Sequence, residues 1–80
     1  MSKKYYRKKL IDLRAALAKE KEAKKKDNEK YANYIKNASS TSTKASYRKS
    51  KIDAAAYHDR RIESIKKDIE RNKELLKREK

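Results

Sequence analysis

The chain has 80 residues, of which 26 are Lys or Arg and 12 are Asp or Glu, and its formal net charge is +14 at pH 7. It contains no Cys, which excludes disulfides and thiolate metal sites, and no Gly or Pro, the usual residues of tight turns and phosphate-binding loops. Because good helix formers such as Lys, Glu, Ala, Arg and Leu are abundant, the composition predicts an all-α protein.

The first half of the chain carries a stripe with heptad spacing. Steps of three and four residues lead from Tyr6 to Tyr34 without a change of phase, which predicts a helix over about residues 3–37. The stripe is apolar at both ends and polar at its centre, where Glu20, Lys24 and Asp27 occupy the apolar positions.

A run of small hydroxyl residues at Ser39–Thr43 predicts a turn over about residues 38–43, because such side chains compete for backbone hydrogen bonds. Asn37 is expected to close the first helix, since Asn tolerates the left-handed conformation. Ser42 or Thr43 is expected to cap the second helix.

The second half repeats the stripe and predicts a helix over about residues 44–78. Folding back at Thr41 places apolar residues opposite one another at both ends, whereas the centre, which includes His58, is expected to be the least stable part. The sequence therefore predicts one antiparallel two-helix hairpin over residues 1–80, with an unbroken helix or a parallel coiled-coil dimer as alternatives. The expected interhelical seam comprises Tyr6, Leu10, Leu13, Leu17, Tyr31, Tyr34, Ile52, Ile62, Ile65, Ile69 and Leu76.

Several apolar residues lie off this stripe and would remain exposed in an isolated hairpin. They are either scattered surface residues of no consequence or the contact surface for another helix, from a partner protein or from a second copy of the chain. The expected partner surface comprises Tyr5, Ile11, Tyr47, Tyr57 and Leu75.

The basic residues are spread over both halves of the chain. This spread indicates a solvated helix surface, or alternatively a surface that binds nucleic acid or anionic membrane through phosphate contacts, although no DNA-binding motif is present. His58 is the only histidine, so the chain alone cannot form a multi-histidine metal site, and it contains no recognisable catalytic arrangement. We therefore expect no enzymatic activity, no cofactor and no bound metal.

Targeting signals are equally limited. No apolar run approaches the ~20 residues that span a bilayer, and the basic amino terminus is not followed by the apolar core of a signal peptide. The expected location is the cytoplasm, and export in complex with a partner stays open as an alternative.

The pattern as a whole resembles the small α-helical partner proteins encoded beside LXG-type toxins of the Gram-positive type VII secretion system. The resemblance is carried by a start rich in Tyr and Lys that runs into Leu10, Leu13 and Leu17, by the polar midpoint, and by the second helix from Ile52 to Ile69. It implies a bacterial adaptor or targeting protein, a helical hairpin that binds the toxin's helical amino-terminal domain. The turn lacks the Trp-x-Gly motif of WXG-type hairpins, and the resemblance assigns a role to no individual residue.

Overall fold

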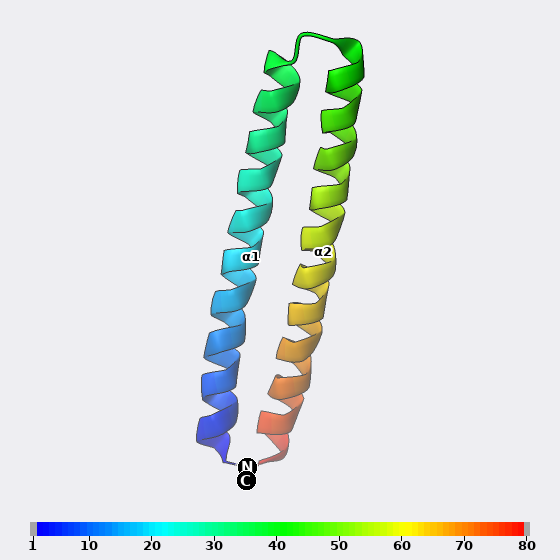
Figure 1. Ribbon diagram of the computed structural model, residues 1–80. Helices are drawn as coiled ribbons and strands as arrows, with labels where there is room; N and C mark the ends of the chain where they lie inside the picture. The colour runs from blue at the N-terminus through cyan, green and yellow to red at the C-terminus, as the bar shows by residue number, and fades with distance from the viewer. Residues whose placement is uncertain (1, 80) are drawn as a thin grey trace.

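The computed structural model describes residues 2–79, which form two long helices packed antiparallel (Figure 1). Helix α1 spans Lys3–Asn37 and helix α2 spans Thr41–Arg78. The hairpin is a rod with principal extents of 62 × 14 × 12 Å, and the start of α1 and the end of α2 lie together at what we call the open end. The predicted all-α antiparallel hairpin is confirmed, and the alternatives of one unbroken helix or a parallel dimer are wrong for this chain.

Helix α1 is closed differently at its two ends. At the start, the Ser2 hydroxyl oxygen accepts a hydrogen bond from the backbone N–H of Tyr5 at 3.3 Å, as an amino-terminal cap does. At the other end Ala38 is extended, with φ −71° and ψ 137°, and its N–H donates to the Ile35 carbonyl. Helix α1 does end at Asn37, but no non-glycine residue in the described range has a positive φ, so the left-handed conformation expected for Asn37 is wrong.

Helix α2 begins three residues earlier than the sequence predicted. Ser40 is extended, and its hydroxyl oxygen accepts from the Thr43 backbone N–H at 3.1 Å. Ser40 is therefore the cap, and Ser42 and Thr43, the residues expected in that role, lie within the first turn. Hydroxyl residues fit a helix well here because one of them satisfies a first-turn N–H that would otherwise have no partner.

The apolar core is thin. In the described part of the chain, only Leu10 and Ile69 are buried apolar residues, with 4% and 7% of their surfaces exposed. The half-buried residues of the expected seam are Tyr6, Leu13, Leu17, Tyr31, Ile62, Ile65 and Leu76. Two helices alone cover only one face of each other, which explains why so few side chains are removed from water.

Near the turn, the seam follows a different line from the predicted one. Ile52 is 68% exposed, because steps of four and three residues back from His58 reach Ala54, Lys51 and Tyr47 instead. Assigning Ile52 to the seam was therefore wrong. Tyr34 is also 44% exposed, although its ring centroid lies 5.2 Å from that of Tyr47 across the seam.

Candidate docking surface

The centre of the hairpin holds a cluster of charged side chains around His58. Helix α1 supplies Glu20 and Asp27, which are two helical turns apart, and α2 supplies the imidazole between them. Nδ1 of His58 lies 2.6 Å from Glu20 Oε2, and Nε2 lies 2.6 Å from Asp27 Oδ2. The ring is therefore bracketed by two carboxylates, with His58 and Glu20 both buried.

This geometry determines the protonation of the ring. A neutral imidazole has one N–H donor, and an ionised carboxylate only accepts, so both short contacts are hydrogen bonds only if His58 carries two protons. Hydrogen bonds to Asp27 and Glu20 accordingly raise the pKa of His58 above its ordinary 6.5, against the opposing effect of burial. The two contacts therefore favour the doubly protonated imidazolium form of His58.

Further cations complete the cluster. The Arg61 guanidinium donates from Nε to Glu20 Oε1, and this bond, followed by that from His58, holds the pKa of Glu20 below its ordinary value. The His58 hydrogen bond likewise lowers the pKa of Asp27. At the edge of the cluster, Lys24 and Asp59 form an ion pair at 2.6 Å.

The sequence predicted the central position of these residues but not their pairing. No buried side-chain nitrogen or oxygen in the described range lacks a hydrogen-bond partner, so the centre of the seam is a satisfied polar network. The two ring nitrogens of His58 and both oxygens of Glu20 are engaged, which leaves the cluster few free groups for a ligand. Over residues 2–79 there is also no group of His, Cys, Asp or Glu arranged to hold a metal ion. We therefore interpret the cluster as a structural clasp between the helices.

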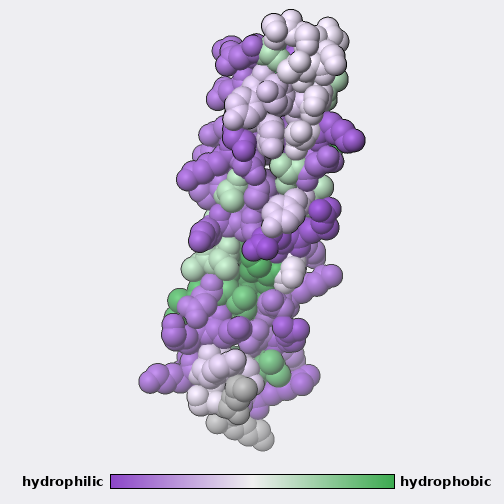
Figure 2. All heavy atoms as spheres, viewed as in Figure 1, coloured by the Kyte–Doolittle hydropathy of each residue, from purple (hydrophilic) through white to green (hydrophobic). Residues whose placement is uncertain are grey.

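The expected partner surface is only partly exposed. Tyr5, Ile11 and Tyr57 present 47%, 65% and 49% of their surfaces to solvent. Tyr47 and Leu75 are half-buried. In the face shown in Figure 2, strongly apolar side chains gather in the half of the rod nearer the open end, surrounded by hydrophilic ones.

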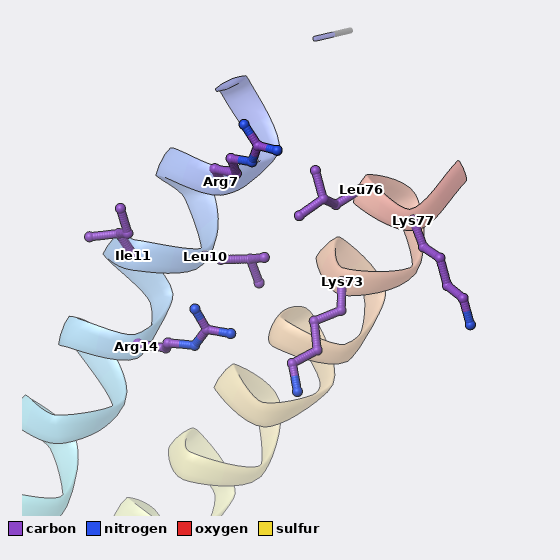
Figure 3. A pocket seen from close by; sticks show the side chains of 7 residues that line it. All are labelled: Arg7, Leu10, Ile11, Arg14, Lys73, Leu76 and Lys77. Carbon is purple, nitrogen blue, oxygen red and sulfur yellow. The ribbon is translucent and has the colours of Figure 1, made fainter. Parts of the chain in front are cut away.

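A shallow groove lies between the helices at this end. Leu10 and Leu76 point toward one another across it, and Ile11 lies on the outer flank of α1 (Figure 3). We call this feature the open-end groove. It is lined by Arg7, Leu10, Ile11, Arg14, Lys73, Leu76 and Lys77.

The sequence reasoning considered the basic residues as a solvated or phosphate-binding surface but did not include those of the open-end groove in the expected partner surface, which comprised only apolar and tyrosine side chains. Their spacing was nevertheless a signal. Arg7, Ile11 and Arg14 each come one position after a residue of the seam in α1, so they share one face of the helix beside the seam. Within residues 2–79 no carboxylate forms an ion pair with Arg7, Arg14 or Lys77. The fourth cation, Lys73, is paired with Glu70 at 3.3 Å.

Comparison of the chain with protein-family models, with curated proteins and with solved structures finds no match. Neither helix, over the residues described, combines the length and apolar character needed to cross a bilayer. The candidate site therefore has to be interpreted from its own geometry.

Proposed function

We propose that this chain is a non-enzymatic adaptor, a helical hairpin that docks along another helical protein and completes a bundle with it. The observation that carries the proposal is the exposure of large apolar side chains on a rod only two helices thick. Ile11 and Ile52 are each about two-thirds exposed, whereas only two apolar residues in the described range are buried. Helical layers normally bury such surface against a further element.

The dimensions of the rod support the same proposal. With lateral extents of 14 and 12 Å, the hairpin has little depth in which to enclose a small substrate, and ligand sites are usually concave pockets that cover most of the ligand. A third or fourth helix packed along the rod would instead gain contacts over much of its 62 Å length. An elongated docking surface is what such a shape offers.

The finer identity of the partner is proposed from the resemblance alone. The order of a Tyr-rich and Lys-rich start, a polar midpoint and an Ile-bearing second helix is similar to the partner proteins of LXG-type toxins. We therefore propose the helical amino-terminal domain of a secreted toxin as the first partner to test.

The test is reconstitution of a defined complex. A tagged chain is used to isolate partners from its native source, and the candidate is then recombined with the pure chain. We expect a complex of fixed stoichiometry in sedimentation analysis and a higher unfolding temperature for the chain within it. The matched variants Ile11→Asp and Ile52→Asp, which change exposed positions, should keep the helical circular dichroism of the parent while at least one weakens the complex. A chain that forms no complex with any helical protein would refute the proposal.

A second candidate function is binding of nucleic acid through phosphate contacts. Two observations favour it: the net charge of +14, and the groove residues Arg7, Arg14 and Lys77, which form no ion pair with a carboxylate among residues 2–79. Affinity for a DNA duplex or a single strand should then fall steeply as salt rises, since each phosphate contact releases bound counterions. A flat salt response, or no binding near physiological salt, would eliminate this candidate.

A further inference from the structure

The open-end groove combines apolar side chains with basic ones at its rim. Its three apolar residues, Leu10, Ile11 and Leu76, come from both helices, and Ile11 is mostly exposed. The side chains of Arg7 and Arg14 extend from α1 toward α2 (Figure 3). Among residues 2–79, the polar residues that line the groove are all cations: Arg7, Arg14, Lys73 and Lys77.

These cations are available to an external partner. Three of the four have no carboxylate partner among residues 2–79. The fourth, Lys73, pairs with Glu70 three residues away, and both side chains are at least half exposed, so the pair exchanges readily with water or another anion. The rim therefore presents unneutralised positive charge beside apolar surface.

We propose that the open-end groove binds an acidic amphipathic helix of another protein. The apolar face of that helix packs on Leu10, Ile11 and Leu76, and its flanking Glu or Asp side chains pair with the arginines and lysines of the rim. This inference rests on the proposed adaptor function and adds to it the location of the site and the charge of the partner.

Charge distinguishes this occupant from the other occupants of such a groove. A second copy of the chain carries the same net charge of +14 and would bring like charges to the rim. A nucleic acid would satisfy the cations, but its phosphates would gain nothing from the exposed side chain of Ile11. Only a partner with both apolar and acidic groups uses the whole lining.

The test uses a fluorescein-labelled peptide of about 20 residues, long enough for a helix of ~30 Å, with Leu at the seam positions and Glu beside them. A second peptide carries Lys in place of each Glu. We expect fluorescence anisotropy to report binding of the acidic peptide, and the basic peptide to bind at least about tenfold more weakly. The double variant Arg14→Glu/Lys73→Glu should lower the affinity for the acidic peptide about tenfold or more and raise the affinity for the basic peptide.

The matched control is Arg48→Glu/Lys49→Glu, which changes the net charge equally at exposed positions near the turn. It should alter the affinity for the acidic peptide by no more than about twofold. The variant Ile11→Asp should lower the affinity for the acidic peptide while leaving the circular dichroism of the chain unchanged. Equal weakening by the two double variants would overturn the proposal, because net charge alone would then explain binding.

Two further results separate the occupants and the two proposals. Preferential binding to phosphatidylglycerol vesicles or single-stranded DNA, with the same sensitivity to Arg14→Glu/Lys73→Glu, would overturn the acidic helix as occupant. Reconstitution with a helical partner that is insensitive to this double variant would overturn the groove assignment and leave the adaptor function intact. Failure of every helical partner and of both peptides would refute both.

Discussion

Truncation of Leu10 tests whether the open end of the hairpin is held by a small number of buried side chains. Leu10 is only 4% exposed, so Leu10→Ala removes three carbons that are almost fully withdrawn from water. Buried Leu→Ala changes cost about 2–5 kcal/mol of the free energy of unfolding. Because Leu10 adjoins an open groove, neighbouring side chains and water can fill the vacated space, so the cost should lie at about 2–3 kcal/mol. For a chain of this size, each kcal/mol shifts the unfolding midpoint by about 4–8 °C. We therefore expect the midpoint, followed by circular dichroism at 222 nm, to fall by about 10–20 °C.

The neighbouring Ile11 provides the control for this experiment. Ile11→Ala deletes the same number of carbons, but Ile11 is 65% exposed, and the change also exchanges a β-branched residue for the best helix former. Its free energy of unfolding should stay within about 0.5 kcal/mol of the parent. Equal effects of the two truncations would refute the assigned phase of α1, because exposure would then fail to predict stability.

The remaining predictions concern protonation and capping. Because the pKa of His58 is raised, its contribution to stability is complete below its ordinary 6.5 and is lost as pH rises through the folded-state pKa. The lowered pKa values of Glu20 and Asp27 act in the opposite sense, since their contribution is present above the ordinary 4.5 and 3.8 and is lost as pH falls through the folded values. The unfolding temperature should therefore pass through a maximum, and His58→Gln should abolish the decline that begins above about pH 6.5. If the variant keeps this decline, a group other than His58 causes it. Ser40→Ala should lower the free energy of unfolding by about 1 kcal/mol in a denaturant titration, whereas Ser42→Ala should leave it nearly unchanged.

The sequence predicted the hairpin because hydrophobic periodicity and the absence of Gly and Pro act over many residues. The long apolar phase of Leu10, Leu13 and Leu17 in α1, and of Ile62, Ile65 and Ile69 in α2, leaves little freedom in how the halves face one another. Details that depend on a single residue were less predictable. Ser40 became the cap in place of Ser42, because a run of similar hydroxyl residues contains several competent caps.

The centre of the seam shows the limit of hydropathy as a guide. Glu20, Asp27 and His58 are all unfavourable when each is considered alone, and the prediction of a weak centre followed from that view. Their complementarity depends on side-chain direction across the two helices, which brings one imidazole between two carboxylates. Likewise, the basic rim of the open-end groove becomes visible only when positions on α1 and α2 are combined.

The His58 clasp also determines which alignment of the two helices is permitted. A slip of one heptad would keep apolar residues facing one another over part of the seam, but it would move His58 to the level of Leu13 and Glu20, or of Asp27 and Tyr34. In either case one carboxylate would lose its pairing with His58, which costs free energy. The slipped alignments, which the apolar contacts alone would allow, are therefore disfavoured. The clasp thus fixes the alignment of the two helices, and with it the level at which Arg7 and Arg14 of α1 lie beside the part of α2 that carries Lys73 and Lys77, about four to five turns along α2 from His58.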